Sequence, residues 1–446
     1  MPVSTPQTLR QGLYLGWAFT LCLTLIAILG AREDRQAIQT VGRDTAPSVI
    51  AAEHIKSALS AMDANAANEL LIAPGHAAEA VKSYDERRAE ASRALIAAAE
   101  NIAYGESERT PILKIQLALG EYEVLVQQAR DYHASGDAAR RDAAYLKATA
   151  KMDDVLWPAA DALDKAGLDM LEDSYKTRRV TAGLSLGVLM FIGLGFLGVL
   201  IVIQVFLFRR TNRVLNPGLI AATLLTFAFL MYAGQTFTAS MRHLKVARED
   251  AFISLHALWR ARAVAYRASA DESRFLLLRA AGEPFDRDFS AQIDSLAKLP
   301  ESGSYEEAAD RAIKGKRPGE FTGYLADELN NITFKGEAEA AKATLIDLRY
   351  YVTASQQIRG LVSAGKRQEA IAQAVEKRNG HSSSWFEQFD RDLGRTLEIN
   401  QKAFDAAVGG GFRTLVGFEP LSLATGASLC LLLWLGIRPR LKEYQV

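Results

Sequence analysis

The chain has 446 residues and carries 52 acidic and 52 basic side chains, so its formal net charge at pH 7 is zero. Because 49% of its residues are hydrophobic, the composition excludes an intrinsically disordered chain. The absence of a basic excess argues against a nucleic-acid partner.

Four segments contain no Asp, Glu, Lys or Arg and are long enough, or nearly so, to cross a membrane. A bilayer core roughly 30 Å thick needs about 20 apolar residues of helix. A core helix of a soluble protein keeps a polar stripe, whereas residues 184–207 have none. The sequence therefore predicts an all-α integral membrane protein with four transmembrane helices. The charge-free segments are residues 11–31, 180–208, 214–241 and 420–437.

The first charge-free segment has a second interpretation, as a cleaved signal peptide. Arg10 would be its basic flank, and cleavage would fall near Leu29-Gly30-Ala31. The small residue expected three positions before that cut is missing, and the internal repeat described below predicts a retained helix. We therefore favour a membrane anchor.

Basic residues indicate which side of the membrane each segment faces. Four crossings put both termini and one short loop on one side, and two long segments on the other. The loop carries Arg209, Arg210 and Arg213 and no acidic residue, and the C-terminal tail is also basic. By the positive-inside rule, both termini of this multi-pass cell-membrane protein are cytoplasmic. Both cysteines lie in predicted spans, so the exterior segments are free of thiols, as suits an oxidising compartment.

These assignments divide the chain into spans, exterior domains and short cytoplasmic segments. The predicted boundaries are 11–31 (first span), 32–178 (first exterior domain), 180–208 (second span), 209–217 (cytoplasmic loop), 218–241 (third span), 242–411 (second exterior domain), 412–437 (fourth span) and 438–446 (cytoplasmic tail).

The two exterior domains repeat one plan. In the first, a helix reaches residues 63–71 and stops at Pro74, and in the second, a helix through residues 268–277 precedes Pro284. Further on, a glycine turn followed by a tryptophan occurs in both copies. A repeat explains both correspondences if the second copy holds an insertion of about twenty residues between positions 300 and 336.

Within each copy the apolar periodicity is helical, and helix breakers divide it into four pieces. In the first copy we expect helices at 32–72, 77–104, 111–135 and 138–178, with Pro111 at the first helical position and Gly136 as a C-terminal stop. A narrow apolar stripe sustained over many turns is typical of an antiparallel four-helix bundle. The sequence thus predicts two tandem extracytoplasmic antiparallel four-helix bundles.

No pattern in the sequence indicates catalysis, a cofactor or a metal. The six histidines include no pair at metal-ligand spacing, and two separated cysteines cannot form a CxxC motif. A dinucleotide-binding pattern, GxGxxG, occurs at residues 193–198, but it lies inside the second span with no preceding strand. We interpret these glycines as sites of close helix packing in the membrane. The protein is therefore expected to be non-enzymatic.

Two features near the fourth span stand out. Glu419 and Pro420 lie early in the span, where a carboxylate is costly and a proline kinks a helix, so they are candidates for an intramembrane switch. The alternative is that Glu419 only reaches the outer interface. Upstream, Gly409, Gly410 and Gly411 weaken a helix by roughly 2 to 3 kcal/mol, which predicts a hinge between the second bundle and its exit helix.

The predicted architecture suits sensing, because a helix rooted in the membrane can slide or tilt against its bundle partner. The predicted cytoplasmic loop and tail are too short to bury a core. We therefore expect the signal to be passed to a separate protein.

The Ala/Asn-rich turn at residues 63–71 resembles that of the four-helix sensor modules of bacterial chemoreceptors. Two such modules with four spans and no effector domain resemble the GlnX-type membrane proteins of actinobacteria. This resemblance implies a link between an extracytoplasmic amino-acid-binding lipoprotein and a soluble cytoplasmic serine/threonine kinase. The lipid bilayer is a further partner, and the sequence leaves a homo-oligomer open. Arg209, Arg210 and Arg213 are our candidates for the kinase contact, with topology signal and lipid contact as the alternative reading.

The rival interpretation is direct sensing of a small molecule. Polar residues in the two corresponding turns are candidates for lining ligand or partner sites between helices, although a polar helix face is often only solvated. A channel or carrier is a third class, which predicts polar residues deep in several spans. The candidate residues are Asp63, Asn65, Asn68 and Glu69 in the first copy and Arg267, Asp271, Glu272 and Arg274 in the second.

Overall fold

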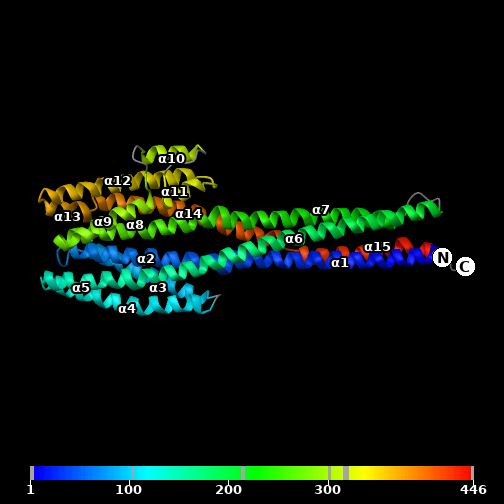
Figure 1. The fold of residues 1–446 in the computed structure, drawn as a ribbon, viewed down its shortest axis with the longest axis horizontal. Helices are drawn as coiled ribbons and strands as arrows, with labels where there is room; N and C mark the ends of the chain where they lie inside the picture. The colour runs from blue at the N-terminus through cyan, green and yellow to red at the C-terminus, as the bar shows by residue number, and fades with distance from the viewer. Residues whose placement is uncertain (1–4, 103–104, 212–215, 300–302, 315–320, 443–446) are drawn as a thin grey trace. The chain divides into compact units, whose positions relative to one another are not determined.

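The computed structural model describes residues 5–102, 105–211, 216–299, 303–314 and 321–442 (Figure 1). All regular elements in these ranges are helices, and one isolated antiparallel bridge joins Lys298 and Thr322. Four helices are long and apolar enough to cross a membrane. The predicted all-α fold with four membrane-spanning helices is confirmed.

The chain divides into two compact units. The membrane unit comprises Met1–Val41, Glu172–Val246 and Ala406–Val446, and the repeat unit comprises Gly42–Leu171 and Ala247–Asp405. The first contains the charge-free segments, and the second contains most of the two predicted exterior domains.

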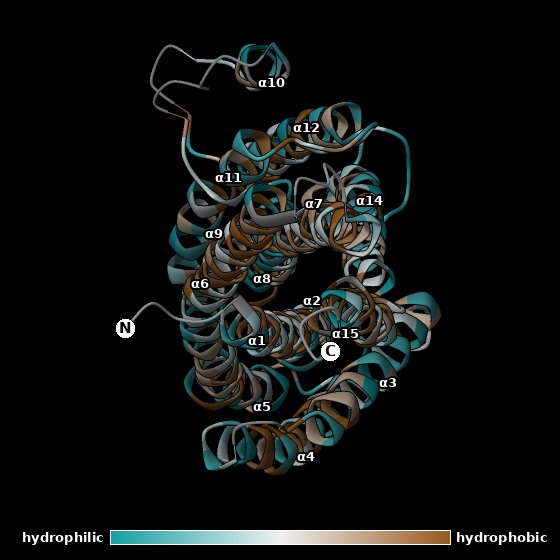
Figure 2. Cartoon of the chain, turned by 90° about the vertical axis from the view of Figure 1, so that its right-hand side faces the viewer, coloured by the Kyte–Doolittle hydropathy of each residue, from teal (hydrophilic) through white to brown (hydrophobic). Residues whose placement is uncertain are grey.

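The membrane unit is a bundle of helices whose polar groups are few. Its helices are α1 (Thr5–Gln39), the C-terminal part of α6 (Trp157–Thr211), α7 (Pro217–Lys245) and α15 (Phe418–Lys442), and α15 packs against both α1 and α7. Large apolar side chains such as Phe191 and Leu21 are more than two-thirds exposed. Figure 2 shows hydrophobic residues along α6 and α7. Such outward-facing apolar surface is what lipid contact requires.

Glycines bring the helices of the membrane unit close together. A Cβ atom on Gly193 would collide with the side chain of Leu230 on α7, and one on Gly195 would lie 3.3 Å from Phe19 on α1. These contacts confirm the packing role predicted for the GxGxxG segment at these two positions. A Cβ atom added to Gly198 would meet no atom of another helix within 4 Å, so close packing does not require glycine at that position.

The repeat unit contains two sets of helices in the same order. The first set is η1 (Thr40–Thr45), α2 (Ala46–Leu71), α3 (Ala78–Glu100), α4 (Glu106–Ala134), α5 (Ala138–Lys151), η2 (Met152–Leu156) and the start of α6. The second set is η3 (Val246–Phe252), α8 (Ile253–Leu278), η4 (Arg279–Gly282), α9 (Glu283–Leu296), α10 (Tyr305–Ile313), α11 (Tyr324–Asn330), α12 (Glu337–Ser363), α13 (Arg367–Val375) and α14 (Ser382–Leu415).

The two sets correspond closely enough to support the internal repeat. A π-helical turn, η1 or η3, precedes the first long helix of each set, and a short helix, α5 or α13, precedes the last. The second set has two additional short helices, α10 and α11. They lie between positions 300 and 336, where the sequence predicted an insertion. We refer to the sets as the first and second repeat.

One predicted helix start is wrong. Helix α4 begins at Glu106 after Gly105, which has a positive φ of 69°, and Pro111 lies inside the helix. Glycine adopts that conformation without steric cost, so the helix begins directly after Gly105, five residues before the predicted start at Pro111.

The two repeats are packed together within the repeat unit. Helix α2 packs against α8 along its length, while α3 covers another side of α2 and α9 covers α8 (Figure 1). Small side chains line the contact, since Ala61 and Ala64 of α2 cluster with Tyr266 and Ala270 of α8. The first helix of each repeat therefore lies at the centre of one joint helical body.

Candidate functional site

A buried ion pair joins the two repeats at the centre of the α2–α8 contact. The guanidinium of Arg274 on α8 donates to the carboxylate of Asp63 on α2 and, at 2.5 Å, to that of Asp271 one turn earlier on α8. All three side chains are at least 97% buried. The spacing of Asp271 and Arg274, three residues apart on one helix, places both on the face that meets α2.

Hydroxyl and amide groups complete this cluster. Tyr122 on α4 and Tyr145 on α5 donate to Asp63 over 3.1 and 3.2 Å, and Gln292 on α9 donates to Asp271 over 2.7 Å. Burial raises the pKa of Asp271 to about 6 against the opposing charge of Arg274. Most buried polar atoms of this cluster, which we call the Arg274 cluster, are hydrogen-bonded to groups on helices of both repeats. The cluster therefore holds the two repeats together in one specific arrangement.

Two further predicted residues, Arg267 and Glu69, lie outside the Arg274 cluster. Arg267 on α8 donates to Asp153 in η2 over 2.9 Å and so forms another link between the repeats. Glu69 pairs with Arg130 over 2.7 Å, but both belong to the first repeat. Glu69 also borders an open groove of about 830 Å³ that is lined by first-repeat residues only.

The remaining candidates, Asn65, Asn68 and Glu272, line one cavity of about 460 Å³. The cavity lies between α2 and α3 of the first repeat and α8, α12, α13 and α14 of the second. Asn68 accepts a hydrogen bond from Ser273 of α8 over 2.5 Å. The structure therefore brings together residues that the sequence assigned to separate sites, one in each repeat.

Glu272 forms the inner wall of this cavity. Its carboxylate accepts hydrogen bonds from Ser382 on α14, at 2.8 Å, and from Ser355 on α12. Burial raises the pKa of Glu272 above its ordinary value, and the two serine hydroxyls and the more distant charge of Arg359 oppose that shift. Arg359 acts on this carboxylate through Ser355, whose hydroxyl accepts a hydrogen bond from Arg359 over 2.6 Å, and Arg359 itself pairs with Asp286.

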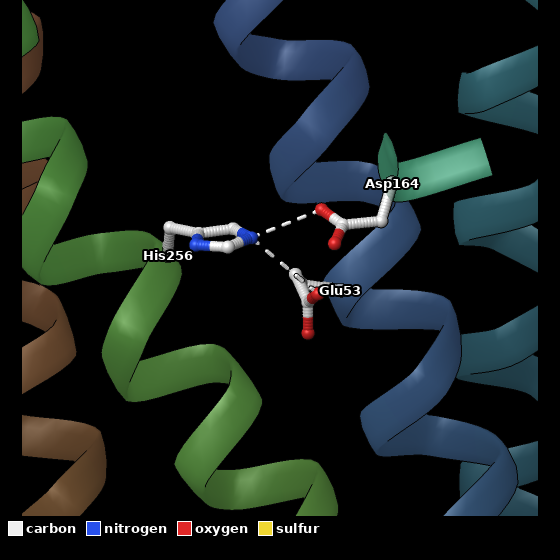
Figure 3. A group of neighbouring side chains, drawn as sticks. All are labelled: Glu53, Asp164 and His256. Carbon is white, nitrogen blue, oxygen red and sulfur yellow. Dashed lines mark hydrogen bonds and ion pairs between the residues drawn. The ribbon is translucent and has the colours of Figure 1, made fainter. Parts of the chain in front are cut away.

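A second buried cluster, which the sequence analysis missed, also joins the repeats (Figure 3). His256 on α8 points its Nε2 atom at Asp164 on α6, 3.0 Å away, and at Glu53 on α2, 3.6 Å away. Lys56, one turn after Glu53, places its Nζ atom 2.5 Å from Glu53. The Glu53/Lys56 spacing was visible in the sequence, but the approach of His256 was not.

This cluster has the ligand atoms that a metal ion needs, since those of Glu53, Asp164 and His256 all lie within 4.8 Å of one another. The ammonium of Lys56, however, is closer to Glu53 than His256 is, and it also lies 2.8 Å from Asp161. A metal would have to displace this tethered cation. The residues therefore fit an internal ion-pair network better than a metal centre.

The predicted hinge glycines lie inside an unbroken helix. Helix α14 continues through Gly409, Gly410 and Gly411 to Leu415, and the chain turns at Gly417, whose φ is 80°. A Cβ on Gly410 would lie 2.6 Å from the ring of His243, and one on Gly411 would lie 2.8 Å from Ile38. Two of the three glycines thus allow close packing in the membrane unit, and the helix is interrupted six residues further on.

Glu419 and Pro420 lie in the first turn of α15. Glu419 pairs with Arg32 over 3.2 Å, and both side chains are partly exposed. A proline in the first turn costs no helical hydrogen bond, because backbone N–H groups there have no intrahelical acceptor. Pro420 is therefore compatible with the first turn of α15, which begins at Phe418.

The predicted cytoplasmic contact is only partly described. Arg209 is exposed near the end of α6. Arg213 and the side chain of Arg210 lie outside the described residues.

A protein-family model matches the first of the two repeats. Residues 37–176 match the family model described as Actinobacterial sensor domain. This range contains α2 to α5 and the start of α6, so it covers the first repeat and its half of both buried clusters. No curated protein and no solved structure gives a match to the chain. The match supports a signalling role for a multi-pass membrane protein whose first repeat resembles an actinobacterial sensor domain.

Proposed function

We propose that the protein is a non-enzymatic transmembrane signal transducer of the GlnX type. In this proposal it relays the state of an extracytoplasmic amino-acid-binding lipoprotein to a separate cytoplasmic serine/threonine kinase. Its large repeat unit faces outward, and the basic loop at residues 209–217 contacts the kinase.

The observation that carries this proposal is the continuity of α6. The sensor-domain match ends at residue 176, within a helix that runs without interruption from Trp157 to Thr211 and through a predicted span. A packed helix has discrete alternative positions, so a small displacement at one end reaches the other. The second repeat is connected to the fourth predicted span through α14 and α15, and a turn at Gly417 separates these two helices. We therefore assign the relay to the first repeat.

Recovery of partners from native membranes tests this function. The intact protein is crosslinked, purified and analysed by mass spectrometry, and a lipoprotein and a kinase recovered together are the expected result. A variant with Arg209, Arg210 and Arg213 changed to glutamine should lose the kinase and keep the lipoprotein. Lys176→Gln, on the predicted exterior flank, is the matched control that should keep both. Recovery of the kinase with the triple variant at the level of the control would refute the assigned contact.

Direct sensing of a small molecule is a second candidate function, which the cavity between the repeats favours. Its volume of about 460 Å³ is within the range of ligand sites, and it is lined by residues of both repeats. A ligand in it would bias the packing of α2 against α8 without a binding protein. Binding of an amino acid to the purified protein in the absence of any lipoprotein is the measurement that separates this function from the adaptor.

A further inference from the structure

We propose that the cavity between the two repeats binds a small molecule through its ammonium group, with Glu272 as the counter-ion and with Tyr266, Tyr351 and Phe386 as an aromatic wall. This inference rests on direct sensing, the second candidate function, and names the class of ligand.

The first argument is the unbalanced charge of Glu272. Its side chain is 4% exposed, and its two oxygens accept only from the neutral hydroxyls of Ser355 and Ser382 among the described residues. A buried carboxylate is costly unless a cation compensates it. Asp63 has such a cation in Arg274, whereas Glu328 and Asp347 of this unit are buried without a lysine or arginine partner among the described residues. Glu272 differs from these two because it lines a cavity. At Glu272 a ligand has room to supply it.

The second argument is an unused hydroxyl in the same wall. Tyr351 on α12 is 1% exposed and lines the cavity, and among the described residues its hydroxyl has only a weak interaction with Ser269, which falls short of hydrogen-bond geometry. An unpaired buried polar group is destabilising, so its presence in a cavity wall points to a missing partner. An ammonium group has N–H donors for both this oxygen and the carboxylate of Glu272.

The third argument is the aromatic surface beside the carboxylate. The ring of Phe386 on α14 meets Tyr266 edge to face at 5.0 Å and Tyr351 at 5.2 Å, and all three residues line the cavity. Aromatic faces attract cations, particularly where water is excluded. A carboxylate next to aromatic rings is therefore a recognition surface for an ammonium rather than for an anion.

The cationic side chains of the cavity are already paired. Arg87 donates to Glu90 over 2.8 Å and to the hydroxyl of Tyr266 over 2.9 Å. At the rim, Lys377 pairs with Glu79 over 2.5 Å and with Glu387 over 3.3 Å. Asp390 is neutralised by two hydrogen bonds from Arg262, at 2.7 and 2.9 Å. Charge recognition is thus concentrated at Glu272.

Binding at this position would engage both repeats. Asn65 and Asn68 face the cavity from α2, whereas Glu272 belongs to α8. Asn65 uses one amide N–H on the carbonyl of Ala61, and Asn68 uses its Oδ1 atom on Ser273. The remaining N–H groups could donate to a second polar group of the ligand, such as the carboxylate of an amino acid. The affinity for a ligand that spans the cavity would therefore depend on the distance between α2 and α8.

The test is equilibrium binding to the full-length protein in nanodiscs, measured by calorimetry. The probes are n-butylamine, its carboxylate counterpart butyrate, and a panel of zwitterionic amino acids. We expect at least one ammonium-bearing probe to bind and butyrate not to bind. Binding of butylamine would identify an amine site, and binding of amino acids alone would identify an ammonium-plus-carboxylate site; both results support the proposal.

Variants locate the site. Glu272→Gln keeps the shape of the side chain and should weaken binding by about tenfold or more, since hydrogen bonds to charged groups are the strong ones. Tyr351→Phe should weaken it less, and Glu398→Gln, which changes an exposed carboxylate outside the cavity, should not weaken it. Glu272→Gln is expected to fold, because it removes a buried charge. Its thermal unfolding curve is the control that checks this.

Binding of butyrate in preference to butylamine, unchanged affinity in a folded Glu272→Gln variant, or failure of all ammonium probes would overturn the ligand class. A different result would contradict the direct-sensing function. Crosslinking between cysteines placed on α2 and α8 measures whether the probe changes the packing of the two helices. If an ammonium probe binds through Glu272 but changes neither this crosslinking nor the recovery of the kinase, the ligand site is confirmed and direct sensing is wrong. If no probe binds while a lipoprotein and a kinase are recovered, the adaptor stands alone.

Discussion

The guanidinium of Arg274 and the carboxylate of Asp63 form an ion pair between residues that are 211 positions apart in the chain. Each comes from the first long helix of its repeat, and each is at most 1% exposed. The pair therefore links the two repeats within the contact between α2 and α8, and its burial makes it sensitive to the loss of either partner.

Removal of the Arg274 charge should strongly destabilise the repeat unit. In Arg274→Met the carboxylates of Asp63 and Asp271 remain buried without their cation, and breaking such a pair costs about 3–5 kcal/mol. The matched control is Arg349→Met, which removes an arginine that pairs with Glu306 but is 37% exposed. Exposed pairs contribute about 0–1 kcal/mol. Thermal or denaturant unfolding of the full-length protein measures both.

The double variant Asp63→Asn/Arg274→Met provides a further check. Because it removes both charges, it should be more stable than Arg274→Met alone. Equal destabilisation by the Arg274 and Arg349 variants would show that the buried pair does not hold the repeats together.

Stability should fall as the pH rises from about 5 to about 8, in part because of Glu53. Burial raises the pKa of Glu53 from the ordinary value of 4.5 to about 8, against the opposing charge of Lys56. Between these values the folded protein holds a proton that the unfolded chain releases, so the contribution is fully present below pH 4.5 and is lost as the pH passes 8.

The variant Glu53→Gln isolates this effect, because glutamine cannot release the proton. Its unfolding temperature should depend less on pH than that of the wild type between pH 5 and 8, and it should be the more stable protein at pH 8. The difference is on the order of a few kcal/mol. The unfolding temperature of Glu53→Gln should still depend on pH to some extent, because burial raises the pKa of Asp271 to about 6. Parallel curves for the two proteins would contradict the assignment.

The sequence predicted local features better than contacts between distant segments. The breakers at Pro74 and Gly136 correctly divided the first repeat, because turn and capping preferences depend on neighbouring residues. The charge-free runs predicted the spans for the same reason, since hydropathy acts over one helix length.

Contacts between the repeats were not predictable from periodicity. Asp63 and Arg274 were both selected as candidates, but nothing in the sequence indicated that they face each other, because the pairing of α2 with α8 depends on the register of two distant helices. The approach of His256 to Glu53 and Asp164 depends on the same register. The glycines at 409–411 were assigned to a hinge on helix propensity alone, whereas packing against His243 and Ile38 determines their surroundings.

Alanine substitutions within the glycine triplet should have opposite effects. Gly409 has space for a methyl group, since the nearest atom to an added Cβ is a terminal atom of Arg413 at 3.6 Å. Gly409→Ala should therefore stabilise α14 by about 0.5–1 kcal/mol. Gly410→Ala places a methyl group 2.6 Å from the ring of His243 and should destabilise the membrane unit, with about 1–3 kcal/mol as the usual cost of overpacking.

Thermal unfolding and partner phosphorylation should be measured for both glycine variants. A hinge predicts that Gly409→Ala and Gly410→Ala alter signalling alike, because each stiffens the same segment. Close packing predicts that only Gly410→Ala does so. Equivalent effects of the two variants would restore the hinge interpretation.

The orientation of the chain can be tested with single cysteines in a background without Cys22 and Cys430. Ser135 and Ser363 are exposed in the first and second repeat, and Arg209 is exposed near the end of α6. The positive-inside rule predicts that a membrane-impermeant maleimide labels Ser135→Cys and Ser363→Cys on intact cells. Arg209→Cys should react only after the membrane is permeabilised, or in inverted vesicles. Labelling of position 209 on intact cells, with positions 135 and 363 protected, would reverse the topology and place the ligand cavity on the cytoplasmic side.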